Sequence, residues 1–277
     1  MPYLKIQSLN LSVKNKILVR DLNLVISNHE RWGLLGRNGA GKTTLLHSII
    51  GIRNYHCGSI QIDGKEVSNL TRSDMATRVG ILFQQGLDTL PTTVFETVML
   101  GRHPHVQSIL RDDPQDIDIA RVALRDLNLN GLEERQVDTL SGGERQRTAV
   151  GRAILSSPEL LLMDEPLGAL DKQLREQMQY EIKHIHESLG VTVVYVTHDQ
   201  DELIRLSNNV VLLDGGQGIA FGDLEQLMIR LDLASLTGGL DAGAVFGVVV
   251  ASHDETYGLS TLTFNGGELV VSRLDLE

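Results

Sequence analysis

The amino-acid sequence predicts an α/β fold in which a parallel sheet carries functional residues where its strands end. Three observations predict this class. A glycine-rich loop joins a short apolar segment at 31–36 to an amphipathic segment at 42–51. An apolar run at 160–163 ends in two acidic residues, and another ends in VYVT directly before a histidine. Continuous apolar runs of this length are typical of parallel strands that are buried on both faces.

The bulk composition restricts the function further. The chain has 277 residues, which is enough for one large domain with a small appendage or for two modest domains. Its net charge of −11 argues against nucleic-acid binding, which depends on basic surface. A single cysteine, Cys57, excludes an internal disulfide and fits a reducing compartment. No apolar stretch reaches the roughly 18–20 residues of a membrane span, so we expect a cytoplasmic chain that meets a membrane through a partner.

The remaining segments follow in chain order. Alternating apolar positions predict antiparallel strands over 3–31, and GSIQIDGKEV at 58–67 predicts a hairpin. Residues 86–139 are mostly polar with a helical pattern, and within them the acidic stretch 111–118 predicts a solvated loop leading into a helix. A further hairpin is predicted at 208–223. The last segment, 244–277, is β-like, with a turn at Asn265-Gly266.

The segment GRNGAGKT at 36–43 matches the pattern G-x-x-x-x-G-K-[ST] between a predicted strand and a predicted helix. Glycines let the backbone curl around a phosphate, and the helix N-terminus adds the positive end of its dipole. We expect Lys42 to reach the β- and γ-phosphates of a nucleotide and Thr43 to bind Mg²⁺. The alternative is a chance glycine turn, which the strand and helix context disfavours. The predicted nucleotide-binding residues of this loop are Gly36, Arg37, Asn38, Gly39, Ala40, Gly41, Lys42, Thr43 and Thr44.

The stretch PELLLMDEP at 158–166 supplies two acidic residues to the same site. Asp164 and Glu165 follow the apolar run at the end of a strand, where α/β sheets place ligands. We expect Asp164 to hold Mg²⁺ and Glu165 to act as general base on the attacking water. A strand that ends in an ordinary charged turn is the alternative, and the phosphate loop makes it the weaker one.

A second phosphate-binding turn is predicted in LSGGERQRTAVGRAIL at 140–155. Ser141 can cap a helix, two glycines follow it, and apolar residues then recur at helical spacing. One chain has little use for two cradles around one nucleotide. Two copies facing head to tail would use both, because each copy would offer the turn at 141–143 to the nucleotide on the other.

At LSGGERQR the sequence resembles the ATPase subunits of ABC transporters, and the resemblance covers roughly 3–222. It implies an ABC-type P-loop ATPase core with an antiparallel β subdomain and a helical subdomain at about 86–157. It implies that Ser141, Gly142 and Gly143 bind the nucleotide of a second copy. Gln84 matches the glutamine that senses Mg²⁺ and the transmembrane partner, with Gln85 as the alternative. Asp171 matches the aspartate of the loop that crosses the dimer, and His198 matches the switch histidine that contacts the γ-phosphate.

Two positions depart from the family pattern. Many members carry an aromatic residue near the start that stacks on adenine, whereas this chain has Val13 or Lys14 near that place. Many also have serine or threonine where this chain has Gly168, a difference that should leave the role of Asp171 intact.

The resemblance implies an ATP-hydrolysing subunit of an importer, with ATP and Mg²⁺ as cofactors. Its partners would be transmembrane permease subunits, a second copy or a paralogue of the chain and, indirectly, a solute-binding protein. It would lie peripherally on the cytoplasmic face of the cell membrane. The domains would be an ATPase domain at 1–222, a linker at 223–243 and a small β-rich extension at 244–277. A soluble ABC ATPase of cluster assembly, translation or repair is the alternative, along with a non-catalytic regulatory module.

Two segments indicate different transported solutes. VFETVMLGRHPH at 94–105 is similar to the ATPases of metal-chelate importers for siderophores, haem or cobalamin. The segment 247–277 is similar to the start of the C-terminal region of molybdate-importer ATPases. The second similarity is longer, so a molybdate-like oxyanion is slightly favoured.

Overall fold

The computed structural model of the protein describes residues 2–14, 16–83, 91–105, 113–168, 170–214, 217–228, 248–255, 257–264 and 266–273. The chain divides into two compact units, Met1–Leu224 and Glu225–Glu277. The predicted linker at 223–243 falls mainly on residues outside the described ranges.

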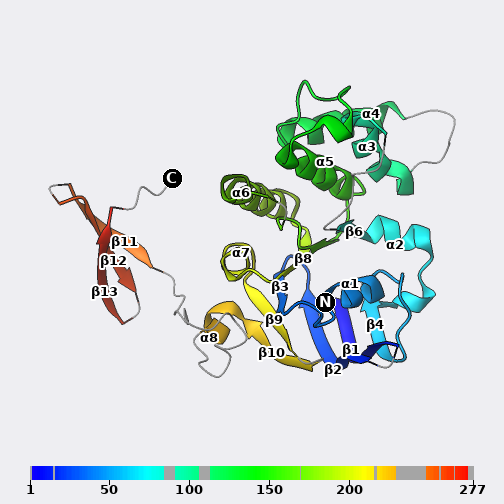
Figure 1. Cartoon of the computed structure of the whole chain (residues 1–277), viewed down its shortest axis with the longest axis horizontal. Coiled ribbons are helices and arrows are strands. Elements are labelled where there is room, and N and C mark those ends of the chain that lie inside the picture. Colours follow the sequence, from blue (N-terminus) through cyan, green and yellow to red (C-terminus); the bar gives the residue numbers. More distant parts are fainter. Residues whose placement is uncertain are drawn as a thin grey trace. The chain divides into compact units, whose positions relative to one another are not determined.

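The N-terminal part of the first unit forms antiparallel strands, as the alternating apolar positions predict (Figure 1). The strands are β1 (Pro2–Val13), β2 (Lys16–Ser27), β4 (Cys57–Ile62) and β5 (Lys65–Glu66). In β2, buried Leu22, Leu24 and Ile26 alternate with exposed residues. One face of this sheet is therefore apolar and packs into the core.

The rest of the sheet carries the parallel strands that the apolar runs predict. These strands are β3 (Arg31–Gly36), β6 (Val79–Leu82), β7 (Leu160–Asp164), β8 (Thr192–Thr197) and β9 (Asn209–Asp214), and β10 (Gln217–Asp223) returns antiparallel to β9. The whole ten-stranded order is β5-β4-β1-β2-β10-β9-β3-β8-β7-β6. Strand β3 pairs with both β8 and β9, so the loops that follow β3, β7 and β8 emerge at one edge of the sheet.

Each central strand is buried on both faces. In β7, Leu160 and Leu162 pack into the cluster that contains α1 (Lys42–Ile49), while Leu161 and Met163 pack into the cluster on the opposite face. The alternation follows from the two-residue period of a strand. It explains why LLLM at 160–163 is a continuous apolar run rather than an alternating one.

The helices of the first unit fall into those that follow strands of the sheet and a separate helical group. Helix α2 is Arg72–Arg78, and α6 (Lys172–Leu189) and α7 (Gln200–Leu206) follow the ends of β7 and β8. A separate helical group contains α3 (Val94–Met99), α4 (Pro114–Asp126) and α5 (Gly142–Ile154), which Figure 1 shows gathered together. The 3-10 helices are η1 (Val67–Asn69), η2 (Leu100–His105) and η3 (Val137–Thr139).

The helix predicted after the acidic stretch 111–118 is present as α4, but its first turn is not fully solvated, and residues 111 and 112 lie outside the described residues. Asp113 caps the helix as expected of an acid at that place, but Asp116 is only 7% exposed. Its carboxylate accepts a hydrogen bond of 2.7 Å from Arg102 Nε. A buried carboxylate needs such a partner, and the partner lies on a different element that local sequence does not indicate.

The second unit contains a three-stranded antiparallel sheet of β11 (Val249–Asp254), β12 (Leu259–Phe264) and β13 (Gly267–Ser272). The short helix α8 (Leu224–Met228) begins at the boundary between the units. Phe264 pairs with Gly267, so a two-residue connection joins β12 and β13 where a turn is predicted. Asn265 itself lies outside the described residues.

Candidate functional site

The glycine loop after β3 leaves the first turn of α1 open to a ligand. Gly39 and Gly41 adopt the left-handed conformation, with φ angles of 82° and 99°. A Cβ atom on Gly41 would lie 3.0 Å from both Cβ and the backbone oxygen of Leu18. In α1, whose residues are all described, no side chain caps the first turn. The first-turn amides of α1 therefore have no side-chain cap, and the loop before them adopts a backbone conformation that favours glycine.

Lys42 is buried inside this loop, with 6% of its surface exposed. Its Nζ donates hydrogen bonds to the backbone oxygens of Gly36, at 2.7 Å, and Arg37, at 3.4 Å. The same atom lies 3.7 Å from Oε1 of Glu165. The ammonium is thus held by carbonyl groups and one carboxylate at the place where the sequence predicts phosphate.

The other loop residues surround Lys42. Arg37 O accepts a hydrogen bond from Ala40 N at 3.0 Å, which closes the turn that contains exposed Asn38 and Gly39. Thr44 lies in the first turn of α1, and its carbonyl accepts from the hydroxyl of Ser48 at 3.0 Å.

Glu165 is the residue that joins the loop after β7 to the loop after β8. Its backbone has a φ of 45°, and its amide donates to the carbonyl of Val196 at 2.9 Å. Its carboxylate Oε1 lies 3.3 Å from Nδ1 of His198 as well as near Lys42. The structure therefore brings Lys42, Glu165 and His198 together from three separate loops, as the sequence predicts for a site at the strand ends.

Asp164 and Thr43 form a pair beside this cluster. Burial raises the pKa of the Asp164 carboxyl above its ordinary value, and the Glu165 charge raises it further. A hydrogen bond from Thr43 and the nearby His47 and Lys42 act in the opposite direction. The carboxylate is therefore desolvated and only partly compensated by the groups around it.

The chemistry of this pair fits Mg²⁺. The cation prefers oxygen ligands and is usually held by one or two carboxylates together with phosphates and water. Asp164 and Thr43 offer a carboxylate and a hydroxyl side by side. The third predicted ligand, Gln84, and its alternative, Gln85, lie outside the described residues.

The predicted second turn begins α5. Ser141 is exposed and its hydroxyl accepts from the amide of Glu144 at 3.3 Å, while Glu144 Oε2 accepts from the amide of Ser141 at 2.8 Å. Gly142 is exposed, and Gly143 is buried at Leu174. Asp171 caps α6 by accepting from the amide of Leu174 at 3.0 Å. Ser141 and Asp171 therefore start their own helices rather than joining the Lys42 cluster.

The sequence prediction missed a polar network that supports the loop of His198. Glu202, in α7, is 3% exposed; it accepts hydrogen bonds from the hydroxyls of Tyr195 and Thr197 and forms an ion pair with Arg175. Burial and the Glu202 charge raise the pKa of Tyr195 far above its ordinary range. An acidic residue on the inward face of a helix could have indicated the network, because such a residue requires buried partners.

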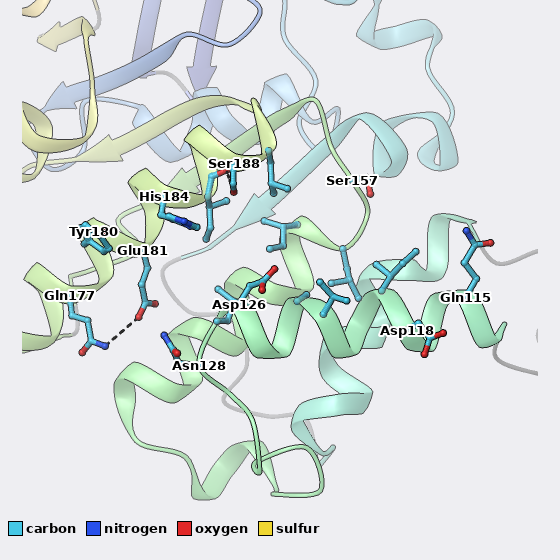
Figure 2. Close-up of a pocket in the computed structure, with 18 of the residues that line it drawn as sticks. Gln115, Asp118, Asp126, Asn128, Ser157, Gln177, Tyr180, Glu181, His184 and Ser188 are labelled. Atoms are coloured by element: carbon cyan, nitrogen blue, oxygen red, sulfur yellow. Dashed lines mark hydrogen bonds between the residues drawn. The ribbon is translucent and has the colours of Figure 1, made fainter.

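An apolar groove of about 1050 Å³ lies elsewhere, between α4 and α6 (Figure 2). Val122, Tyr180 and Leu189 are exposed members of its wall, and Glu181 and Asp126 contribute carboxylates. None of its described lining residues belongs to the predicted nucleotide site. Among the described helices of the protein, none is long and apolar enough to span a membrane.

Comparisons with known proteins place the chain in a family. The family model described as "ABC transporter" matches residues 19–168, more than half of the chain. The molybdenum import ATP-binding protein ModC of Paramagnetospirillum magneticum is 38% identical over 247 residues, covering 88% of this chain and 66% of that protein. The spermidine/putrescine import ATP-binding protein PotA of Acetivibrio thermocellus is 38% identical over 215 residues, covering 77% of this chain and 59% of that protein.

A solved structure agrees with this placement. An ABC transporter of metal-chelate type in an inward-facing conformation superposes with a TM-score of 0.75 at 27% identity, covering 85% of this chain and 89% of that one. This chain spans 66% and 59% of the lengths of the two relatives from sequence. The phosphate loop, the acidic strand end and these matches together establish that the chain belongs to the ABC transporter family.

Proposed function

We propose that the chain is the ATP-binding and ATP-hydrolysing subunit of an ABC importer. The observation that carries the proposal is the meeting of Lys42, Glu165 and His198 within 3.7 Å contacts beside an open helix N-terminus. A cation can stabilise phosphate charge at such a place, and a carboxylate or an imidazole can position the attacking water. The names of both sequence relatives, which are import ATP-binding proteins, support the same function.

The residues of the phosphate loop would hold the nucleotide. Lys42 already faces the carbonyl oxygens of Gly36 and Arg37, so on binding its ammonium would exchange these neutral acceptors for phosphate oxygens. The amides at the start of α1 would contribute further donors and the positive end of the helix dipole.

Asp164 and Thr43 would hold Mg²⁺, together with Gln84. When bound, the cation would neutralise charge on the phosphates. The neighbouring Glu165 carboxylate adds to the burial that raises the pKa of Asp164, and the groups around it compensate this only in part, so a cation would relieve it.

Glu165 would take the proton from the attacking water, and His198 would contact the γ-phosphate. The 3.3 Å contact between their side chains lets the imidazole orient the carboxylate, and Lys42 contacts the same carboxylate oxygen. Glu165 adopts a φ of 45°, a conformation that non-glycine residues rarely hold and that is concentrated at functional sites.

Two copies would complete two sites. Ser141, Gly142 and Gly143 are at the start of α5, and Asp171 is at the start of α6, so none of them reaches the Lys42 cluster of its own chain by a hydrogen bond. A second copy placed head to tail would bring its Ser141 turn to the phosphates. Binding energy would close the pair, and hydrolysis would reopen it.

We propose ATPase residues 1–222, a linker at 223–243 and a β-rich extension at 244–277. The helical subdomain would be about 86–157. Its surface would meet transmembrane permease subunits at the cytoplasmic face of the membrane, and the permease would receive solute from a binding protein. No nucleic-acid role is proposed, because the net charge is −11.

For the solute, a molybdate-like oxyanion is placed first. The ModC match extends over 88% of the chain and the PotA match over 77%. The longer match supports the tail similarity on which the preference rests. A metal chelate is second, supported by the transporter of metal-chelate type among the solved structures.

A pull-down of the tagged chain from gently solubilised native membranes tests the proposal. Recovery of a polytopic permease is the expected result, and the binding protein encoded beside it would then be screened with molybdate, siderophores and polyamines. Recovery of soluble partners only, from a preparation that hydrolyses ATP, would instead support a soluble ABC ATPase.

A further inference from the structure

Arg175, in the first turn of α6, contacts three different parts of the chain through three different nitrogens. Nη2 donates to the backbone oxygen of Leu170 at 3.1 Å. Nη1 lies 3.5 Å from Oδ2 of Asp199, and Nε lies 3.5 Å from Oε1 of Glu202. The contacts with Leu170 and Asp199 are hydrogen bonds, and the contact with Glu202 is an ion pair without hydrogen-bond geometry. Because the guanidinium is rigid and planar, the three contacts together tie these groups to one another.

Two of the three groups that Arg175 contacts, Asp199 and Glu202, hold the loop that carries His198. The Asp199 amide donates to the hydroxyl of Thr197 at 3.0 Å, and the Asp199 carboxylate caps α7. The hydroxyl of Thr197 donates in turn to Glu202 at 2.7 Å. His198 therefore lies between two residues that are each tied into the network of Glu202 and Arg175.

The third group that Arg175 contacts, the carbonyl of Leu170, lies in the loop that follows β7. Leu170 directly precedes Asp171, the cap of α6, and its carbonyl is held by Arg175. The loop that contains Leu170 begins at Glu165, whose carbonyl accepts from the amide of Gly168 at 3.2 Å. One side chain thus links the loop from Glu165 to Asp171 with the loop of His198.

We infer that Arg175 is a positioning residue for ATP hydrolysis: its guanidinium locks the Asp171 loop to the His198 loop, so that the two move as one. The inference rests on the proposed function and deepens it. Among the residues that the structure describes, Arg175 contacts Leu170, Asp199 and Glu202 and not the Lys42 cluster, so it acts through His198 and Asp171 rather than on the nucleotide.

The planar guanidinium of Arg175 reaches three groups at once, and the substitutions at this position separate its charge from its shape. Glu202 is buried with 3% exposure, so it needs a cation nearby, which lysine also supplies. A single ammonium cannot reach Leu170, Asp199 and Glu202 in the same geometry. Arg175→Lys therefore keeps the charge and loses the lock, whereas Arg175→Gln loses both.

The chain offers a matched control on the same two helices. Arg205, in α7, donates to Oε1 of Gln179, in α6, at 3.3 Å. This bond also joins α6 to α7, but it touches neither loop. Arg205→Gln thus measures the effect of loosening the helix pair alone.

The test uses the full chain and measures ATP hydrolysis, ATP affinity and the ring resonances of His198. These resonances are identified by their loss in His198→Ala. Arg175→Lys should lower kcat about 10- to 100-fold, the size of effect expected from a small misplacement of reacting groups. ATP affinity should stay within about threefold because Lys42 is untouched. The His198 resonances should shift in the absence of nucleotide, and those of exposed His184 should not.

Two results would overturn the inference. One is wild-type kcat and unshifted His198 resonances in Arg175→Lys. The other is an equal loss of kcat in Arg205→Gln, which would assign the effect to helix packing. If Arg175→Gln does not fold, Arg175→Lys still decides the outcome. Failure of the proposed function is separate, since it would appear as a wild-type chain that does not hydrolyse ATP, while the resonance shift is measured without turnover.

Discussion

The carboxylate of Glu165 and the imidazole of His198 lie 3.3 Å apart, although they come from loops that follow different strands. Glu165 is mostly buried, whereas the side chain of His198 is 54% exposed. The buried partner is held by the Val196 carbonyl and by Lys42, so it has a fixed position. The exposed partner can reach outward to a phosphate while it still touches the base.

His198→Ala should therefore lower the rate of ATP hydrolysis by roughly 10²–10³-fold, the cost of removing one group that stabilises developing charge. ATP affinity should change little because Lys42 and the loop amides remain. Steady-state ATPase assays and equilibrium binding measure the two effects. His184→Ala, which removes an exposed histidine of α6, is the control and should match the wild type. Undiminished turnover in His198→Ala would remove this residue from the mechanism.

Lys42→Ala should abolish measurable ATP binding, a loss of at least roughly 100-fold, because a buried ammonium is replaced by a methyl group at the phosphate site. Titration calorimetry provides the measurement. Lys65→Ala, at an exposed position in β5, is the control for a lost lysine and should bind normally. Unchanged affinity in Lys42→Ala would place the nucleotide somewhere else.

Ser141→Ala distinguishes two roles of Ser141: capping α5 and contacting the nucleotide of a second copy. The change should cost about 0.5–2 kcal/mol of unfolding free energy, since it removes one half of a capping box. Thr93→Ala removes the equivalent half of the capping box of α3 and should cost about the same. Urea unfolding measures both. Only Ser141→Ala should also reduce ATP hydrolysis, and an equal reduction in Thr93→Ala would count against a role of Ser141 at a second site.

Asp164 gives a prediction for pH. Burial raises its pKa, so the folded protein holds a proton on this carboxyl more readily than the unfolded chain does. Ionised Asp164 therefore lowers the free energy of unfolding at neutral pH. This destabilisation disappears as the pH falls from the raised pKa of the folded state to the unfolded-state pKa of about 3.9. Asp164→Asn should unfold at higher urea than the wild type at pH 7.5 without nucleotide, with a smaller difference at pH 4.5.

A carboxylate with the opposite shift provides the control for that experiment. Hydrogen bonds from the Thr71 hydroxyl and amide lower the pKa of Asp74. This group contributes stability above the unfolded pKa and loses it as pH falls. Asp74→Asn should therefore lower the stability at pH 7.5. Changes of the same sign in Asp164→Asn and Asp74→Asn would contradict the electrostatic explanation.

The sequence predicted those features that depend on local pattern. The apolar runs that became β3 and β7 had the length of buried strands, and the glycines at 39 and 41 marked the loop between β3 and α1. Because parallel strands end at a common edge, the loops after them meet, and this brought Lys42, Glu165 and His198 together. The hairpin predicted from GSIQIDGKEV at 58–67 is present as the antiparallel pair of β4 and β5.

Local sequence patterns do not predict contacts between elements that are far apart in the chain. Arg175 forms an ion pair with Glu202, and Arg102 forms one with Asp116. In both pairs a buried acid has its partner on another element. No periodicity indicates which arginine serves which acid. The apolar groove between α4 and α6 was likewise absent from the prediction, since it depends on how two helices are spaced.

In the proposed mechanism, two copies close around ATP that is held by Lys42 and hydrolysed through Glu165. Light scattering with gel filtration on Glu165→Gln, with and without ATP and Mg²⁺, measures this closure. We predict a monomer without nucleotide and a dimer that retains two ATP molecules with it. A chain that binds ATP at full stoichiometry yet remains a monomer would contradict the claim.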